Sequence, residues 1–442
     1  MPKTSRWFGL TLIVALFMSL LGPTSRPAAA AGLIIDPLLT QKLNSVLPTT
    51  SLQAILTYDH KPTTLDIAAV TGLGLLVQKF ETLPMLGILG TPPQIRAALG
   101  LGGLRSAYYN KPLEYLLHES VPLIGADRVW NELGYTGRGV GVAVIDSGID
   151  GLHPDLQFGS AVVQNVKILA PNLFGLGPIV AENLPTSDTT SGHGTHVAGT
   201  IGGRGTASDG YYRGVAPDSK LIGISAGDAI SILFALEGFD YALAHRTQYN
   251  IRVISNSWGT TGEFVATDPI NVASKQAHDA GVVVVFAAGN EGPGNNTLNP
   301  YSVAPWVIGV AAGAKDGATL GDFSSRGIPG DSLYHPTITA PGVSIVSTRA
   351  PNSILPVLGA PDDLSINPAW IPYYTTMSGT SMATPHVAGV LALMLEAKPT
   401  LTPDQLKDIL VQTAKPMPGY QQFEVGAGYI DAYAATTAAR SR

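Results

Sequence analysis

Short apolar runs alternate with longer segments of helical periodicity from about residue 140 to the end of the chain. The runs are rich in β-branched residues and bounded by turn residues, which is typical of strands buried in a parallel sheet. They lie at 140–145, 219–224, 251–256 and 281–286. Helices are predicted at about 193–202, 229–246, 268–280, 380–397 and 403–414. The alternation predicts an α/β domain in which helices cover both faces of a mostly parallel sheet.

Residues 32–115 show a different pattern, which predicts a separate α+β unit. A strand is expected at 51–59, a helix and turn at 63–75, and two strands within 75–90. A proline-led helix start follows at 91–99. The succession of strand, helix, two strands and helix sets these residues apart from the rest of the chain.

The first 31 residues have the pattern of a secretory signal peptide. Two basic residues precede 15 apolar residues at 7–21, a Gly-Pro pair ends this run, and 28–31 offers a small-residue cleavage site. An uncleaved membrane anchor is the alternative, but 15 apolar residues are short for a bilayer span of about 20. We therefore expect cleavage near Ala30 or Ala31 and a secreted, extracellular protein that keeps no membrane attachment.

Composition narrows the classes of partner and the means of stabilisation. The 442 residues are 45% hydrophobic and 13% charged, so the chain can bury a large core. A net charge of −6 gives no reason to expect nucleic acid or an anionic membrane as a partner. The chain has no cysteine, so a secreted form must be stabilised by its core, by bound ions or by both. A secreted protein without cysteine is more typical of bacteria than of eukaryotes.

The candidate nucleophile is Ser381, in the segment GTSMATPHVAG at 379–389. Glycine stands two residues before it and an apolar helix follows, so its hydroxyl can lie at the positive end of a helix, where developing negative charge is stabilised. A serine at a helix start is more often an ordinary N-cap. The catalytic interpretation therefore depends on partner residues elsewhere in the chain.

Three further segments supply candidate partners. Asp146 ends the predicted strand in VAVIDSGIDGLHPDL, and α/β sheets gather catalytic groups at the carboxyl ends of their strands. His193 opens the predicted helix in SGHGTHVAGTIGG, and Asn290 follows the strand in VVVVFAAGNEG. A turn-capping Asp and a turn Asn are the simpler alternatives for two of them. His193 and His196 stand three residues apart, as zinc ligands can, but HExxH and cysteine are absent, which argues against zinc.

Taken together, these segments resemble the subtilisin-like serine proteases, the subtilase or S8-type family of secreted protease precursors. The order Asp, His, Ser is that of this family and differs from the orders in chymotrypsin and in α/β-hydrolases. Further matching segments, FSSRG, TAPGVSI and GAGYIDA, follow in the family's order within residues 121–435. The resemblance implies a three-layer α/β fold with a mostly parallel sheet and helices on both faces, preceded by a ferredoxin-like α+β prosegment.

The resemblance also implies a role for each matched residue. Asp146, His193 and Ser381 correspond to the catalytic triad, with Ser381 as nucleophile, His193 as base and Asp146 as the carboxylate that orients the imidazole. Asn290 and the backbone N–H of Ser381 correspond to the oxyanion hole. The implied reaction is the hydrolysis of peptide bonds in polypeptide substrates through an acyl-enzyme, and its chemistry requires no cofactor.

The family pattern points to substrate-binding residues as well. Ser257-Trp258-Gly259 match the segment whose backbone pairs with the substrate, although a core aromatic is the alternative for Trp258. Backbone pairing predicts broad specificity. Glu291 matches the rim of the specificity pocket, where a carboxylate can admit a basic P1 residue, but an apolar or aromatic P1 residue is the default expectation.

A structural calcium ion is a further implication of the resemblance. Asp155 matches a carboxylate that binds calcium in many members of the family. Calcium takes six or more oxygen ligands. The stretch 204–217 departs from the family's calcium loop and offers only Asp209 as a loose substitute.

The resemblance finally predicts how the chain is divided and processed. It implies a signal peptide at 1–31, an inhibitory and folding-assisting prosegment at 32–116 and a catalytic domain at 117–442. Processing is expected between Arg105 and Glu119, near Leu116-Leu117, in a monomer inhibited by its own prosegment. An ordinary N-terminal domain kept in the mature enzyme is the alternative for 32–116. A maturation protease with one substrate and a catalytically silent binding module are the alternative functions.

Overall fold

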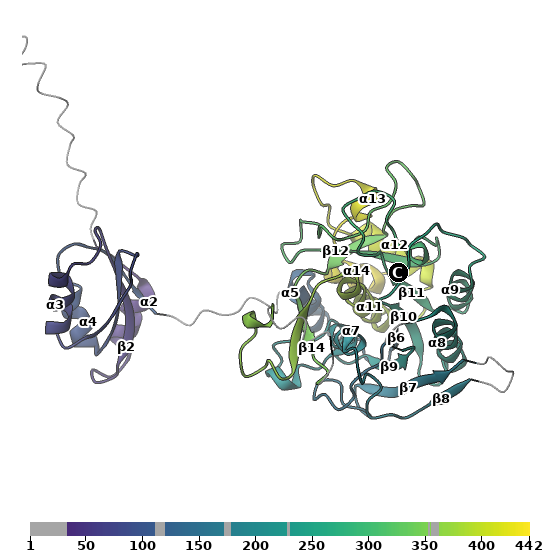
Figure 1. The fold of residues 1–442 in the computed structure, drawn as a ribbon, viewed down its shortest axis with the longest axis horizontal. Coiled ribbons are helices and arrows are strands. Elements are labelled where there is room, and N and C mark those ends of the chain that lie inside the picture. Colours follow the sequence, from purple (N-terminus) through teal and green to yellow (C-terminus); the bar gives the residue numbers. More distant parts are fainter. Residues whose placement is uncertain (1–32, 111–119, 172–177, 228–229, 352–353, 355–361) are drawn as a thin grey trace, which may run out of the picture. The chain divides into compact units, whose positions relative to one another are not determined.

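The computed structural model describes residues 33–110, 120–171, 178–227, 230–351, 354 and 362–442. The chain divides into two compact units, residues 1–114 and 115–442, and each is described by itself (Figure 1). The predicted signal peptide and the predicted processing site near Leu116-Leu117 lie outside the described residues. No helix within the described ranges is both long and apolar enough to cross a bilayer.

The first unit is a five-stranded sheet with its helices packed into one core. Its elements are β1 (Ile34–Ile35), α2 (Pro37–Ser45), β2 (Leu52–Tyr58), α3 (Thr64–Gly72), β3 (Leu76–Lys79), β4 (Met85–Gly90), α4 (Pro92–Ala98) and β5 (Leu104–Tyr109). The strand order is β1-β5-β2-β4-β3, and all neighbours except β1 and β5 are antiparallel. From β2 to β5 this is the ferredoxin-like βαββαβ succession. The strands and helices predicted between residues 51 and 99 are therefore confirmed.

Local sequence explains why these elements form. Alternate residues of β2 are buried, so the strand turns one apolar face to the helices. Helix α3 begins where the Thr63 side chain accepts a hydrogen bond from the backbone N–H of Asp66, while the Asp66 carboxylate accepts from the N–H of Thr63. This reciprocal cap satisfies two donors that the first turn of a helix leaves unpaired.

The second unit contains an eight-stranded sheet. Its strands are β6 (Gly141–Asp146), β7 (Val162–Ala170), β8 (Ile179–Ala181), β9 (Lys220–Ser225), β10 (Ile251–Asn256), β11 (Val283–Ala287), β12 (Ile308–Gly313) and β13 (Ile338–Pro341). The order is β13-β12-β11-β10-β6-β9-β7-β8, and every neighbouring pair is parallel except β7 with β8. The central strand β6 is buried along its whole length.

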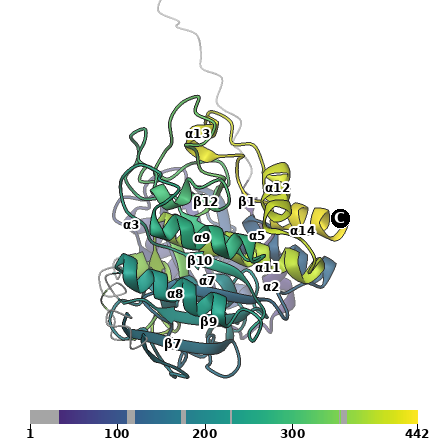
Figure 2. The ribbon, with the colours of Figure 1, turned by 90° about the vertical axis from the view of Figure 1, so that its right-hand side faces the viewer.

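Helices cover both faces of this sheet. Val142 and Val144 of β6 pack into a core with α7 (His193–Gly202) and α11 (Thr380–Ala397). Ala143 and Ile145 turn the other way, into a core with α8 (Ile232–Ala244) and α9 (Pro269–Asp279). Figure 2 shows α8 and α9 side by side over the strands. The predicted three-layer α/β architecture is confirmed.

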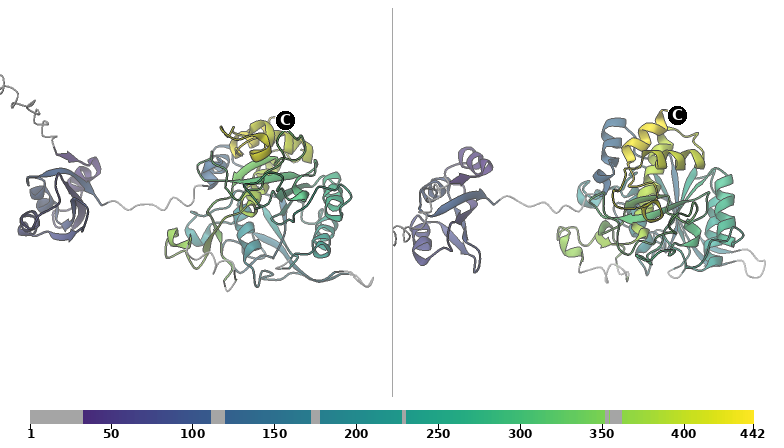
Figure 3. Two further views of the ribbon diagram at one scale, coloured as in Figure 1. Left: turned by 45° about the horizontal axis from the view of Figure 1, so that its top comes forward. Right: turned by 90° about the horizontal axis from the view of Figure 1, so that it is seen from above.

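Shorter elements complete the second unit. The hairpin β14 (Ile345–Thr348) and β15 (Tyr374–Met377) leads directly into α11. Further α-helices in the described part of this unit are α5 (Ser120–Leu123), α6 (Ala126–Arg128), α12 (Pro403–Thr413), α13 (Gln422–Val425) and α14 (Ala432–Arg440). Helices α12 and α14 lie next to each other near the C-terminus (Figure 3).

Candidate active site

The fold brings the candidate catalytic residues to one edge of the sheet. Asp146 is the last residue of β6, His193 the first of α7, and Ser381 the second of α11. Asn290 follows β11, the strand that lies two places from β6. Residues 47 to 235 positions apart in the sequence therefore meet at the carboxyl ends of the central strands.

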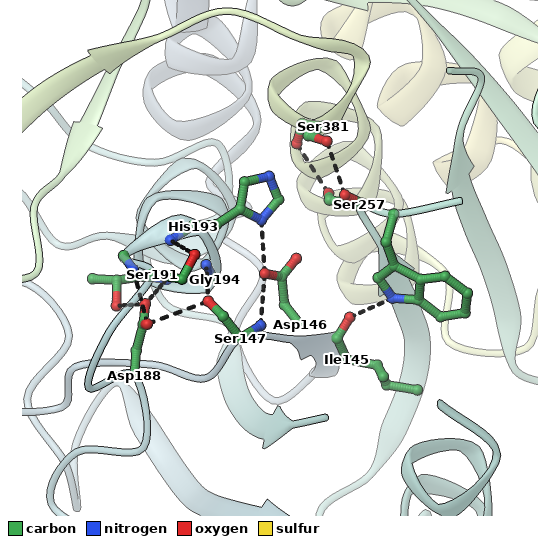
Figure 4. A network of polar contacts seen from close by, with 12 residues as sticks. Ile145, Asp146, Ser147, Asp188, Ser191, His193, Gly194, Ser257 and Ser381 are labelled. Carbon is green, nitrogen blue, oxygen red and sulfur yellow. Dashed lines mark hydrogen bonds and ion pairs between the residues drawn. The ribbon is translucent and has the colours of Figure 1, made fainter. Parts of the chain in front are cut away.

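Asp146 and His193 form the core of this constellation (Figure 4). The Asp146 side chain is 2% exposed, and its Oδ1 lies 2.7 Å from His193 Nδ1. The same oxygen accepts a hydrogen bond from the N–H of Ser147 at 2.8 Å. A carboxylate can only accept, so the shared proton belongs to Nδ1 and the neutral ring presents Nε2 as a base. Figure 4 shows that second nitrogen turned to the side of the ring on which Ser381 lies.

Ser381 and Ser257 are joined by two hydrogen bonds. The Ser381 hydroxyl donates to the Ser257 carbonyl at 2.8 Å, and the Ser257 hydroxyl donates to the Ser381 carbonyl at 2.9 Å. The second bond has a cause in the sequence, because Pro385 lacks the N–H that would otherwise bond to the carbonyl four residues earlier. Among contacts between described residues, none joins the Ser381 hydroxyl to His193. The Ser381 hydroxyl has to leave the Ser257 carbonyl before it can donate to the imidazole.

A second buried carboxylate, Asp188, lies behind the histidine and was missed by sequence reasoning. It accepts from the N–H of Gly192 at 2.9 Å, and from the N–H and hydroxyl of Thr195 at 3.1 and 2.6 Å. It also accepts from the hydroxyl of Ser147 at 3.3 Å. Asp188 therefore fixes the first turn of the helix that carries His193. Its position five residues before His193, at a helix N-terminus, is the signal that could have found it.

The charges around His193 set its basicity. Burial lowers the pKa of His193, but the charge of Asp146, the hydrogen bond to it and the charge of Asp188 together outweigh burial. The net result is a pKa raised above the ordinary 6.5. Burial in turn raises the pKa of Asp188, against the lowering effect of its hydrogen bonds from Thr195 and Gly192.

Two hydrogen bonds from Thr380 hold the side-chain amide oxygen of Asn290 in place. Oδ1 accepts from the N–H and from the hydroxyl of Thr380, each at 2.9 Å. The anchoring leaves the two N–H donors of Nδ2 available to other acceptors. Asn290 and Ser381 both line one cavity of about 350 Å³.

That cavity contains most of the predicted substrate-binding residues. Trp258, Gly259 and Glu291 line it, whereas Ser257 lies beside it in the pairing with Ser381. The indole of Trp258 also packs against Phe286 at 5.3 Å and donates to the carbonyl of Ile145 at 2.7 Å. Trp258 thus packs in the core, as one interpretation expected, and also lines the cavity, whereas its substrate-binding role stays a prediction.

Asn299 joins the two walls of the cavity and was also missed by sequence reasoning. Its Nδ2 donates to the carbonyl of Ala287 at 2.8 Å and to that of Trp258 at 3.1 Å. Ala287 is the last residue of β11, and Trp258 follows the end of the neighbouring strand β10. A Cβ at Gly259 would lie 2.2 Å from this nitrogen, so only glycine fits there. No local sequence signal marks Asn299, because its partners lie 12 and 41 residues away.

Asp155, the expected calcium ligand, is fully buried and already hydrogen-bonded. Its two carboxylate oxygens accept from the N–H of Ala207 at 2.9 Å and from the hydroxyl of Tyr374 at 2.7 Å. Asp209 is exposed and is not among its partners. In the part of the chain that the structure describes, no three His, Asp or Glu side chains are grouped as a metal site.

His196 donates from Nε2 to the carbonyl of Ile345 at 3.0 Å, as expected for a packed structural histidine.

Comparison with known proteins places this geometry in a family. The model of the subtilase family matches residues 137–429. The serine protease AprX of Bacillus subtilis (strain 168) is 34% identical over 356 residues, which are 76% of this chain and 75% of AprX. Subtilisin of Bacillus pumilus is 36% identical over 306 residues, 68% of this chain and 92% of that protein.

A solved structure gives the same result for the fold. The structure of sphericase matches with a TM-score of 0.54 and 28% sequence identity, over 69% of this chain and 96% of sphericase. The family match covers the segments that carry Asp146, His193, Asn290 and Ser381. The chain therefore belongs to the subtilase family and is a subtilisin-type serine endopeptidase.

Proposed function

We propose that this protein is a secreted endopeptidase of broad specificity that uses Asp146, His193 and Ser381 as its triad and is made as an autoprocessed precursor. The observation that carries the proposal is the 2.7 Å bond between Asp146 and His193 beside a cavity lined by Ser381 and Asn290. The geometry provides a base of fixed tautomer, a hydroxyl nucleophile and an amide donor at one place.

The proposed reaction begins with proton transfer from Ser381 to His193. As the serine Oγ attacks the scissile carbonyl, Nε2 of His193 takes its proton, and Asp146 stabilises the imidazolium that forms. His193 then gives the proton to the leaving amine as the C–N bond breaks. The acyl-enzyme that remains is hydrolysed by water. The hydrogen bond from Ser381 to the Ser257 carbonyl must break first, because the same proton passes to His193.

Asn290 is proposed to stabilise the oxyanion of the tetrahedral intermediate. Thr380 holds its amide oxygen through two hydrogen bonds, so Nδ2 is oriented before the substrate arrives. A donor oriented in advance costs little reorganisation in the transition state, which makes it effective. Replacing Asn290 by Leu is expected to lower kcat by about 10²–10³-fold, a magnitude known from this family.

The cavity beside Ser381 is proposed to take the P1 side chain. Gly259 and Trp258 give it an apolar wall, which fits an apolar or aromatic residue, and Glu291 at its edge gives secondary acceptance of a basic one. The prosegment assignment is supported by the separate ferredoxin-like unit that precedes the catalytic unit. We propose that this unit assists folding, inhibits the enzyme and is removed by the enzyme itself.

Intact mass and casein hydrolysis of three secreted proteins test the proposal. Wild type is expected to lose the residues before a site within 105–119, whereas Ser381→Ala keeps them and hydrolyses casein about 10⁶-fold more slowly. Ser441→Ala, an exposed serine outside the site, serves as the matched control and is expected to behave as wild type. Casein hydrolysis by Ser381→Ala at the wild-type rate would contradict the proposed nucleophile. Processing of Ser381→Ala in a host that lacks other secreted proteases would contradict autoprocessing alone.

A further inference from the structure

A buried cluster around Asp155 joins the chain segments that lie next to all three proposed triad residues. Asp155 follows β6, which ends in Asp146. Ala207 and Ser208 lie in the short turn after α7, which begins with His193. Tyr374 opens β15, which leads into α11 and Ser381. Contacts within this cluster therefore connect the chain segments next to Asp146, His193 and Ser381.

The cluster is held by hydrogen bonds from protein donors. Asp155 accepts from the N–H of Ala207 at 2.9 Å and from the Tyr374 hydroxyl at 2.7 Å, and the Tyr374 oxygen lies 2.9 Å from Ser208 Oγ. Asp155 and Tyr374 are both fully buried. Burial and then the charge of Asp155 raise the pKa of Tyr374, so its hydroxyl remains a donor over the whole working pH range.

Aromatic rings fill the space around the carboxylate. The ring of Tyr212 lies 4.7 Å from that of Tyr374, and the ring of Trp370 lies 5.6 Å from that of Tyr212. The imidazole of His153 lies 5.9 Å from Tyr374 and accepts the N–H of Asp155 on Nδ1. Burial lowers the pKa of His153, which agrees with a neutral ring that donates from Nε2 to the Tyr373 carbonyl.

These donors do not fit a calcium ion at Asp155. Calcium needs six or more oxygens at 2.3–2.6 Å. Both oxygens of Asp155 face hydrogen-bond donors, whose protons repel a cation, and the neighbouring rings supply no carboxylate or carbonyl ligand. A metal bound here would have to displace the Tyr374 hydroxyl from a packed core.

We propose that the Tyr374 hydroxyl and the Ala207 N–H take the place that calcium holds at the matching carboxylate in many subtilases. A hydrogen-bonded cluster then joins the three segments, and the stability of this region does not depend on calcium. Removing the Tyr374 hydroxyl leaves a buried carboxylate oxygen without a donor, which is among the more costly single changes in a protein core.

Thermal unfolding of the full-length Ser381→Ala protein tests this inference, since that variant does not digest itself. Tryptophan fluorescence reports on the second unit, because Trp7 is the one tryptophan of the five outside it. Tyr374→Phe in this background is expected to lower the midpoint by about 3–8 °C, equally in calcium and in excess EGTA. Tyr212→Phe is the matched control. It removes a buried hydroxyl of the same cluster that has no partner among the described residues, and should shift the midpoint by less than about 2 °C.

Calcium titration of the same proteins distinguishes a hydrogen-bonded Asp155 from one that binds calcium. A midpoint that rises with calcium in Ser381→Ala, and no longer rises when Asp155→Asn is added, would overturn the inference. A rise that persists in Asp155→Asn places the ion elsewhere and supports it. If Asp155→Asn fails to fold, the effect of calcium on the unfolding midpoint of Tyr374→Phe is measured instead. A midpoint that calcium restores to the parent value overturns the inference, and one that stays lowered supports it. Equal effects of Tyr374→Phe and Tyr212→Phe would also overturn it.

Discussion

His193, the proposed base, lies between two buried carboxylates, Asp146 and Asp188, and its basicity follows from their charges and from burial. Asp146 fixes the tautomer, and together with Asp188 it raises the pKa of the imidazole against the effect of burial. The base must be neutral to accept the serine proton. The structure therefore predicts an acid limb of the activity profile with its midpoint above pH 6.5, and activity that stays high on the alkaline side.

Asp188→Asn tests the electrostatic role of the second carboxylate. Its negative charge favours imidazolium, so removing it should lower the pKa of His193 and move the acid limb of kcat/KM to lower pH. The profile is measured with a short peptide substrate from pH 5 to 9. Loss of folded protein lowers the plateau without moving the midpoint, so a purely structural role predicts an unchanged midpoint. A midpoint that stays or rises would contradict the prediction.

At the scale of elements, the ends of β10 and β11 form the two walls of the cavity, and Asn299 holds them together. Its donated hydrogen bond to Ala287 is buried and the one to Trp258 is half-buried, and Gly259 leaves the space that its amide occupies. The width of the cavity therefore depends on a side chain that need not touch the reacting atoms.

Asn299→Ala is expected to widen or loosen the cavity. The carbonyls of Ala287 and Trp258 lose their donor. The value of kcat/KM should fall about tenfold for substrates with Phe at P1, mainly through KM, and less for Ala at P1. Asn295→Ala, an exposed residue of the same loop, is the control and should leave both substrates unaffected. A uniform fall for both substrates through kcat would assign Asn299 to the catalytic step and contradict the prediction.

Sequence reasoning found the elements with strong local signals and missed those without them. The bounds of α7, α11 and β10 agree with the predicted 193–202, 380–397 and 251–256. The strand β7 was missed because Gln164, Asn165 and Lys167 interrupt its apolar pattern, and β12 because it is rich in Gly and Ala. The candidate triad could be identified because each residue lies in a distinctive segment. Asp188, Asn299 and Tyr374 act through partners distant in the chain, which no local pattern encodes.

At the scale of the whole molecule, the first unit carries its own pH-sensitive contact. His60 contacts Asp59 through Nδ1 and Asp66 through Nε2, and these hydrogen bonds raise the pKa of His60. Hydrogen bonds from Thr63 and then from His60 lower the pKa of Asp66 to about 2. The carboxylate's contribution to stability is present above its ordinary pKa of 3.8 and is lost as the pH falls towards 2. The His60 contribution is full below pH 6.5 and is lost as the pH rises through the raised pKa.

The first unit should therefore loosen as the pH rises into the range in which His193 is neutral. Hydrogen exchange of peptides across residues 59–72 is measured in the Ser381→Ala precursor at pH 6 and pH 8.5, after correction for the intrinsic rates. Protection should be lower at pH 8.5, and His60→Gln should remove most of this difference. Equal protection at both pH values in the parent protein would contradict the prediction.

Fluorophosphonate labelling followed by peptide mapping tests whether Ser381 is a nucleophile activated by His193, because the probe reacts only with an activated serine. Wild type, Ser381→Ala and His193→Ala are treated alike. In the two variants, which are not expected to process themselves, residues 32–116 are first removed with an added metalloprotease. We expect one adduct in wild type, on the peptide that contains Ser381, and none in Ser381→Ala. Labelling of His193→Ala should be slower by at least about 10³-fold. An adduct on another serine, or unchanged labelling without His193, would contradict the proposed triad.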